Sequence, residues 1–217
     1  MNIVLSFQMS YIILLTTATI TFIESIRTNI PMVRHIFNLE TCVSLVAAYF
    51  YSLFLERLKD FEEKNKMIDW AEMTKIRYMD WVITTPMMLV VLCGTLAYNS
   101  KTKVLLVPIA GIILLNYVML GLGYLGEINT LDKITAASGG FLTLFAMFGA
   151  IYYYFIHPKQ KTVNYILYGF YLAVWSMYGV VYFFPEETKN IGLNVLDVLS
   201  KCLLGLGLWV YFTKIVV

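Results

Sequence analysis

Residues 194–209 read NVLDVLSKCLLGLGLW and place Asp197 and Lys201 inside an otherwise apolar stretch. Because the two charged residues are four positions apart, a helix brings them to one face, one turn apart. No charged residue follows Lys201 before Lys214, so the amine cannot easily extend to a membrane surface. An ionisable group near the centre of a bilayer costs at least about 2.5–3.5 kcal/mol. The stretch therefore predicts a functional site inside a transmembrane helix.

The composition of the whole chain supports a membrane location. Of the 217 residues, 59% are hydrophobic and 14% are charged, whereas soluble domains carry about 25% charged residues. This composition excludes a soluble enzyme, and at about 20 residues per crossing it leaves little sequence for a domain outside the bilayer. The net charge is only +2 and no basic tract is present, so we expect no nucleic-acid partner. We expect a single domain over residues 1–217, with a lipid bilayer as its surroundings and no enzymatic activity.

Polar residues divide the sequence into seven apolar segments, each long enough to cross a bilayer. They predict an all-α membrane protein with a seven-transmembrane-helix bundle. The first segment lacks the cleavage site of a signal peptide, so we interpret it as a membrane helix. The predicted helices cover residues 2–26, 33–55, 78–99, 103–126, 133–156, 162–184 and 191–214.

Basic residues in the short connections predict the orientation of the chain, because loops rich in Lys and Arg stay in the cytoplasm. One side carries Arg27, Arg34, Lys101, Lys103, Lys159, Lys161 and, near the C-terminus, Lys214. The long connection 56–77 mixes six basic with six acidic residues and gives no clear signal. We therefore expect the N-terminus outside the cell and the C-terminus in the cytoplasm.

The three cysteines, Cys42, Cys93 and Cys202, all lie in apolar runs. Their odd number and wide spacing match neither a disulfide framework nor a set of metal ligands. We expect three buried thiols and no metal site.

A second charged motif lies in residues 77–88, which read RYMDWVITTPMM. The helices that hold Asp80 and Asp197 are predicted to run in the same direction, so both carboxylates can lie on one side of the Lys201 amine. Arg77 would then balance their charge. Such a cluster can simply be a buried salt bridge that holds two helices together. A buried lysine is also a nucleophilic amine suited to forming an imine with an aldehyde, and nearby carboxylates would keep that imine protonated.

These motifs together resemble the microbial (type I) rhodopsins, seven-helix proteins that bind retinal. The resemblance runs from the second predicted helix to the C-terminus. RYMDWVITTP resembles the third helix of light-driven proton pumps, LDVLSK at 196–201 resembles the retinal-lysine motif, and GYLGE at 123–127 resembles the fourth helix of proteorhodopsins.

The resemblance implies a role for each intramembrane charge. It implies all-trans retinal in a central pocket, attached to Lys201 as a protonated Schiff base. Asp80 and Asp197 would be its counterions, with Asp80 as the proton acceptor. Arg77 would be the extracellular gate.

Aromatic residues gain a role only through this resemblance, since an aromatic stripe alone is typical of packing or of a membrane-interface belt. Gly179 stands where the family usually has proline, which implies a weaker kink in the sixth helix. The implied retinal pocket consists of Trp81, Thr84, Met88, Trp175, Tyr178 and Tyr182.

Val91 is the most informative departure from the pumps of the family. Outward proton pumps usually place a carboxylic acid at this position, eleven residues after Asp80, so a fast donor-assisted pump is not expected. Polar residues elsewhere instead indicate an ion path, with an ion pair between Glu24 and Arg34 at its inner constriction. The candidate path comprises Ser10, Glu24, Arg34, Glu40, Lys189, Asn190 and Asn194. Five of these residues also have a purely structural explanation: a helix-end salt bridge for Glu24 and Arg34, a contact between helices or subunits for Glu40, and a cap or a pair within the helix for Asn190 and Asn194.

The spacing of Lys189, Asn190 and Asn194 resembles that in the viral rhodopsins of giant algal viruses, particularly the group regarded as light-gated cation channels. The implied function is a photoreceptor that opens a path for monovalent cations or protons after all-trans to 13-cis isomerisation and loss of the Schiff-base proton. A weak light-driven outward proton pump is the alternative, and a sensory rhodopsin is a third. The sequence leaves open whether copies of the chain form a homo-oligomer.

Overall fold

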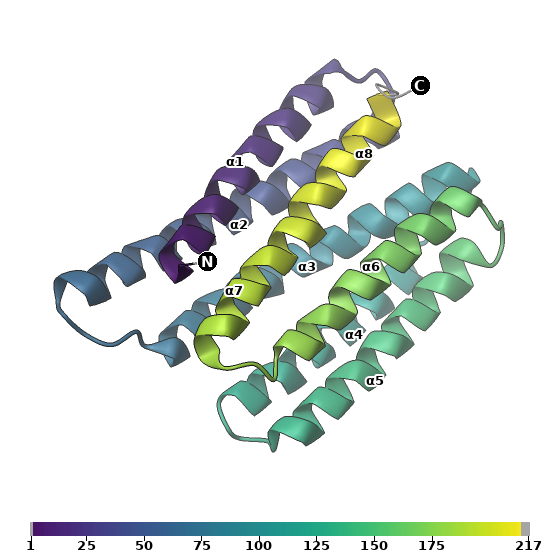
Figure 1. The fold of residues 1–217 in the computed structure, drawn as a ribbon. Coiled ribbons are helices and arrows are strands. Elements are labelled where there is room, and N and C mark those ends of the chain that lie inside the picture. Colours follow the sequence, from purple (N-terminus) through teal and green to yellow (C-terminus); the bar gives the residue numbers. More distant parts are fainter. Residues whose placement is uncertain (1, 214–217) are drawn as a thin grey trace. The chain divides into compact units, whose positions relative to one another are not determined.

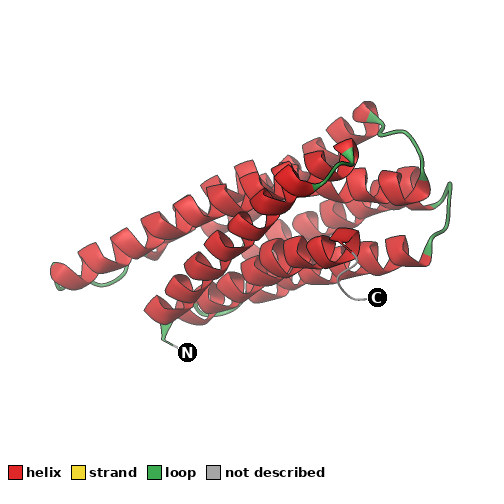
Figure 2. Cartoon of the chain, turned by 90° about the horizontal axis from the view of Figure 1, so that it is seen from above, coloured by secondary structure: helices red, strands yellow, loops and turns green. Residues whose placement is uncertain are grey.

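The chain folds into helices joined by short loops, and no strand occurs among residues 2–213, the part that the computed structural model describes (Figure 2). Seven continuous helices are present in this part. They are α1 (Ile3–Arg27), α2 (Pro31–Glu63), α3 (Trp70–Ser100), α4 (Leu106–Glu127), α5 (Lys133–Ile151) with the π-helix η1 (Tyr152–Ile156), α6 (Thr162–Val181), and α7 (Glu186–Asp197) with the π-helix η2 (Val198–Leu203) and α8 (Leu204–Thr213).

The all-helical class and the seven helices are confirmed, but three helices are longer than expected, among them the last, which already begins at Glu186. α2 continues to Glu63 and α3 already begins at Trp70, so most of the charged connection 56–77 is helical. Its acidic and basic residues stabilise the extra turns, because they pair at one-turn spacing, as in Lys64 with Asp60 at 2.6 Å. The end of the last predicted helix, with Lys214, lies outside the described residues.

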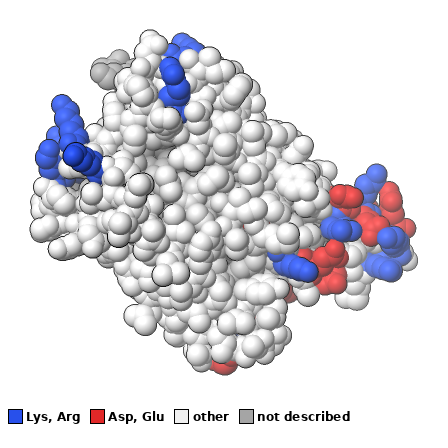
Figure 3. Space-filling view, turned by 180° about the vertical axis from the view of Figure 1, so that it is seen from behind, with Lys and Arg blue, Asp and Glu red and all other residues white. Residues whose placement is uncertain are grey.

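Six of the described helices are long and apolar enough to cross a membrane. The exception is α6, whose four tyrosines lower its hydropathy. On the face drawn in Figure 3, the charged side chains gather in separate patches and the rest of that face is uncharged. This pattern agrees with helices that face lipid.

The helices form two compact units. The first contains the chain up to Asp80 and again from Val180, and the second contains Trp81–Gly179. α3 therefore contributes to both units. Whether the whole chain acts as a single domain stays a prediction.

In the first unit, α1 packs along α2, and the continuous helix from α7 to α8 packs along α1 (Figure 1). Small hydroxyl residues on α1 allow this close approach, since they add little bulk and can bond to backbone carbonyls. They are Ser6, Ser10, Thr17, Thr21 and Ser25, all buried. Thr21 also hydrogen-bonds to Thr41 of α2, with 2.9 Å between the hydroxyl oxygens.

In the second unit, α4 packs against α5, and neutral amides join α3 to its neighbours. Asn164 of α6 is buried and donates to the Ser100 hydroxyl at 2.9 Å and to the Leu96 carbonyl at 3.1 Å. It accepts a hydrogen bond of 2.8 Å from Asn99. Asn116 of α4 donates to Thr85 at 2.8 Å. These bonds hold the helices in register without charge.

The prediction of three buried thiols was wrong for Cys42, which is exposed, whereas Cys93 and Cys202 are buried. Residues on both sides of Cys42 in α2 are buried, so Cys42 itself lies on the opposite face. In a membrane protein an apolar run does not imply burial, because an apolar helix face can point toward lipid. Within residues 2–213 no group of His, Cys, Asp and Glu side chains is arranged to hold a metal ion.

Candidate functional site

The centre of the candidate site is the Lys201 amine, whose side chain is 1% exposed. Its Nζ lies 2.7 Å from Oδ2 of Asp80 and 3.7 Å from Oδ2 of Asp197, both fully buried. The wider turns of η2 carry Lys201, and Asp197 ends α7 just before them. Buried charges are stable only when they are paired. The amine and the two carboxylates meet this condition together.

Arg77 of α3 supplies the fourth charge. Its guanidinium is buried, and Nη1 lies 3.4 Å from Oδ2 of Asp197. Nη2 donates to the side-chain oxygen of Asn194 at 2.8 Å and to that of Asn190 at 3.1 Å. Two cations and two carboxylates therefore meet, and their formal charges cancel. The structure brings together all four intramembrane charges singled out in the sequence.

Tyr51 of α2 is a member of this network that the sequence analysis missed. Its hydroxyl lies 2.8 Å from Oδ2 of Asp197 and 3.0 Å from the side-chain oxygen of Asn194, and it donates to these acceptors. A tyrosine in an apolar helix gives no sequence signal for such a role, because most such tyrosines pack or lie at the membrane interface. Only the fold brings Tyr51 to the carboxylate.

Asn194 links the charges to α1. Its side-chain nitrogen donates to the Ser6 hydroxyl at 2.9 Å, and its backbone carbonyl accepts a bond of 3.4 Å from Ser10. Ser10, Asn190 and Asn194, all assigned to the candidate ion path, therefore lie in one network with Arg77. Their amide and hydroxyl groups are occupied by one another, by Ser6, Tyr51 and the Glu186 carbonyl, and by the guanidinium.

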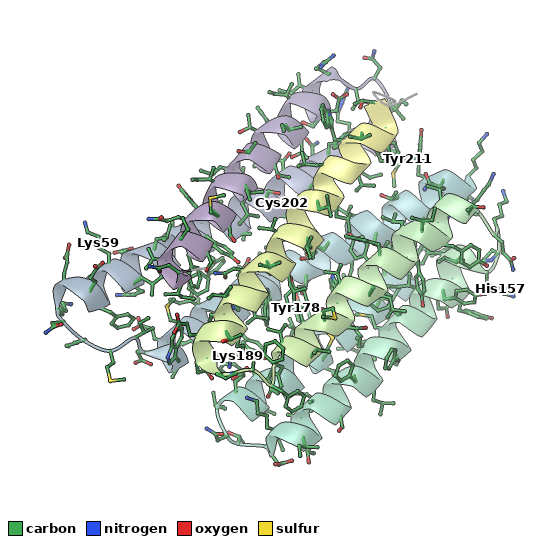
Figure 4. All side chains as sticks on the ribbon, in the orientation of Figure 1. Lys59, His157, Tyr178, Lys189, Cys202 and Tyr211 are labelled. Carbon is green, nitrogen blue, oxygen red and sulfur yellow. The ribbon has the colours of Figure 1, made fainter. Side chains whose placement is uncertain are left out.

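Lys189, a further residue of the candidate path, lies near the start of α7 (Figure 4). Its side chain is buried and pairs with Glu186 of the same helix at 2.8 Å. The pair is local to the first turn of the helix, where an acidic side chain is favoured by the helix dipole.

Glu40 of α2 lies on the other side of Lys201. Its side chain is buried, and a Cβ placed on Gly205 would stand 3.0 Å from its Oε2 and 3.2 Å from Cγ2 of Thr17. Gly205 follows Lys201 by four residues, whereas the partners of Arg77 on α7 all precede Lys201. Glu40 is thus about one helical turn beyond Lys201 on the side away from Arg77. Among the described residues, no ion pair or hydrogen bond reaches its carboxyl.

The predicted ion pair between Glu24 and Arg34 does not form. Glu24 instead lies 4.0 Å from Arg27, one turn further along α1. The Arg34 guanidinium donates to the backbone carbonyl of Thr28 at 2.9 Å, just after the helix ends. Carbonyls at a helix C-terminus lack partners within the helix and attract cationic side chains. This local acceptor takes the place of the more distant carboxylate.

Most of the predicted retinal-pocket residues lie in the second unit. There the rings of Trp81 and Tyr178 meet edge to face with centroids 5.4 Å apart, and Trp175 meets Phe148 in the same way at 6.0 Å. Thr84 and Met88 are buried. Tyr182 belongs to the first unit and is also buried. The roles of these six residues in binding retinal stay predictions.

Gly179, which stands at the usual proline position, has a packing reason to lack a side chain. A Cβ built at this position would overlap the ring of Phe141 on α5. Any larger residue therefore requires the ring to move.

The family profile of bacteriorhodopsin-like proteins matches residues 2–215. The chain is also 40% identical to viral rhodopsin OLPVRII, with a TM-score of 0.91 and with 99% of each chain covered. The chain is a member of the bacteriorhodopsin-like family. This microbial rhodopsin is therefore a multi-pass integral membrane protein, and its family implies a retinal chromophore and light-driven ion transport.

Two more distant structures share the fold of this rhodopsin. The blue light-absorbing proteorhodopsin from Med12 is 20% identical, with a TM-score of 0.75 and coverage of 98% of this chain and 96% of that one. Acetabularia Rhodopsin I is 18% identical, with a TM-score of 0.76 and coverage of 98% and 94%. The comparison with curated proteins gave no match.

The residues around Lys201 fit the retinal that the rhodopsin family implies. An imine formed on this amine would be buried and would carry a proton only if anionic groups lay close by. Asp80 and Asp197 meet this requirement with two carboxylates within 4 Å of the nitrogen.

Proposed function

We propose that this rhodopsin is a light-driven outward proton pump that carries retinal on Lys201. The observation that supports the proposal is the position of Glu40, a buried carboxyl about one turn beyond Lys201 and on the side opposite to Arg77. Bound retinal would supply the absorption of visible light and a change of shape that moves the Lys201 nitrogen. The protein's own groups would then supply a proton acceptor on one side of that nitrogen and a donor on the other.

Asp80 is the proposed acceptor of the proton from Lys201 Nζ. It is the nearer of the two carboxylates, at 2.7 Å. Asp197 accepts a hydrogen bond from Tyr51 and lies beside Arg77, and both contacts favour its ionised form. Asp80 is therefore the carboxylate that takes the proton, and Arg77 lies between this site and the start of α7, where the proton would leave.

Glu40 is the proposed donor that returns a proton to the Lys201 nitrogen. Burial without a cationic partner favours the neutral carboxylic acid, which has a proton to give. In the orientation predicted from the basic connections, the side chain would then regain a proton from the cytoplasm. Glu40 would thus be the proton donor of this rhodopsin. Other pumps have a carboxylic acid for this purpose at the position of Val91, which is buried and apolar here.

A light-gated cation channel is the second candidate, and a specific observation favours it. Buried hydroxyl residues follow α1 from Ser6 to Ser25, and the first two, Ser6 and Ser10, bond to Asn194 of α7. A cation path needs oxygen atoms that replace water along its length. The bonds that Asn194 makes to Ser6 and Ser10 would have to break before ions could pass. Loss of charge at Lys201 and Asp80 would be the trigger.

Voltage-clamp recording from retinal-supplied cells separates the two functions. A pump current stays outward over the physiological voltage range, whereas a channel current reverses and follows the cation gradient. We expect an outward current that falls about tenfold in Glu40→Gln at high light, since loss of a general acid typically costs at least this much. Glu62→Gln, at an exposed position near the end of α2, is the control for loss of a carboxylate. A reversing current would favour the channel, very small currents would favour a sensor, and a full outward current in Glu40→Gln would exclude Glu40 as the donor.

A further inference from the structure

Three aromatic rings of α1 and α2 enclose the Arg77 guanidinium. Its central carbon lies 4.8 Å from the ring centre of Phe54, 5.5 Å from that of Phe7 and 6.0 Å from that of Tyr51. All three rings are fully buried, as is Arg77. A cation over a ring face is attracted by the π electrons, and the attraction is strongest where water is excluded.

The three rings also hold one another in place. The centroids of Phe7 and Phe54 are 4.9 Å apart, and that of Tyr51 lies 5.6 Å from Phe54 and 5.7 Å from Phe7. Each ring has few rotamers, and each contacts the other two, so the group is rigid. We call these three residues the aromatic cage.

The hydrogen bonds of Arg77 fix only part of its guanidinium. They engage Nη1 and Nη2 at the tip of the side chain, whereas Nε is buried without a hydrogen-bond partner among the described residues. The bonds therefore fix the end of the guanidinium, and the flat faces of the rings restrict the rest. Two of these bonds go to the neutral amides of Asn190 and Asn194, whose strength does not depend on the protonation of a carboxylate.

We propose that Phe54 and Phe7 are positioning residues that hold Arg77 against Asp197. With the cage intact, loss of the ion pair between Lys201 and Asp80 does not by itself allow Arg77 to turn away. This restraint goes beyond the proposed transport function, because it acts in the dark and applies equally to a pump and to a channel.

Rotation of the Arg77 guanidinium in the dark tests the proposal directly. The chain has four arginines, so selective ¹⁵N labelling of arginine gives few signals, and Arg77→Lys assigns those of Arg77. Slow rotation about the Nε–Cζ bond keeps the two Nη signals apart, and faster rotation merges them. Phe54→Leu keeps an apolar side chain but removes the π face. We expect the guanidinium to rotate about tenfold faster in this variant, because the loss of one buried cation–π interaction lowers the barrier by an amount that corresponds to about a tenfold change in rate.

Two variants separate the π interaction from packing. Phe54→Trp keeps an aromatic face and should retain slow rotation. Phe50→Leu makes the same change at another buried position of α2, outside the three rings found around Arg77, and it should also leave the rotation unchanged. The proposal would be overturned if the rotation rate in Phe54→Leu equalled that of the unmodified protein. It would also be overturned if the guanidinium rotated as fast in Phe54→Trp as in Phe54→Leu.

A second position keeps the test independent of folding defects. Each variant is first checked for the visible absorption band of the retinal-loaded protein. If Phe54→Leu lacks this band, Phe7→Leu on α1 replaces it and is judged by the same two outcomes. Because the measurement is made without light, its result does not depend on whether the chain pumps, conducts or signals.

Discussion

Tyr51 donates a hydrogen bond of 2.8 Å to Oδ2 of Asp197, across two helices and out of reach of water. A hydrogen bond to a charged group contributes about 1.5–3 kcal/mol to stability. We therefore expect Tyr51→Phe to destabilise the retinal-loaded protein by about this amount, measured as the midpoint of pigment loss in a denaturant titration. Tyr49→Phe, on an exposed ring two residues earlier, is the control. Equal midpoints for Tyr51→Phe and the unmodified protein would contradict the role of this bond.

Removal of the Lys201 amine should abolish the pigment. In Lys201→Ala no amine remains beside Asp80 and Asp197, so retinal has no attachment site. We expect no visible absorption band in membranes supplied with all-trans retinal. Lys59→Ala, which alters an exposed lysine in α2 (Figure 4), should form the normal pigment. A coloured Lys201→Ala protein would disprove the assignment of the attachment site.

Gly205 leaves the space that the Glu40 carboxyl fills. In Gly205→Ala the added methyl group would stand 3.0 Å from Oε2, closer than most real contacts, so we expect the carboxyl to shift. If Glu40 returns the proton to Lys201, flash photolysis should show that step slowed about tenfold, as expected for a displaced general acid.

Two further variants test whether the slower proton return is caused by displacement of the Glu40 carboxyl. Gly207→Ala adds the same methyl group in the same helix, where no described atom outside that stretch of helix lies within 4 Å, and it should behave like the unmodified protein. Glu40→Asp shortens the carboxyl side chain and should partly restore the rate when combined with Gly205→Ala. No slowing in Gly205→Ala would show that the position of Glu40 is unimportant for this step.

Gly179 allows the close packing of α6 on Phe141 of α5. Gly179→Ala introduces a clash with this ring, and overpacking of this kind typically costs about 1–3 kcal/mol. We expect a lower thermal midpoint of pigment loss, with recovery in the double variant that also carries Phe141→Leu. Gly169→Ala, in the same helix and with open space around it, should not lower the midpoint. Equal losses in both alanine variants would argue against the packing role.

The amino-acid sequence was sufficient to predict the seven helices and the meeting of four charges, for a simple physical reason. Long apolar segments have few alternatives to membrane helices, and a charge inside one of them needs a partner. An unpaired buried charge is costly, so the positions of Asp80, Asp197 and Lys201 within apolar segments already indicate that these three side chains meet.

Three features could not be predicted, because each depends on competition between local and distant partners. Arg34 bonds to a nearby backbone carbonyl instead of Glu24. The rings of Phe7 and Phe54 around Arg77 are indistinguishable in the sequence from the other aromatic residues, and only the packing of α1 on α2 selects them. The position of Glu40 beside Gly205 likewise depends on which faces of α2 and α8 meet.

The hydrogen bonds that join α6 to α3 through Asn164 depend little on pH or salt concentration. Asn164 bonds to Asn99, Ser100 and a backbone carbonyl, and none of these groups gains or loses a proton at physiological pH. Salt screens only charges. These three hydrogen bonds should therefore keep their strength in acidic and neutral media and at low and high ionic strength.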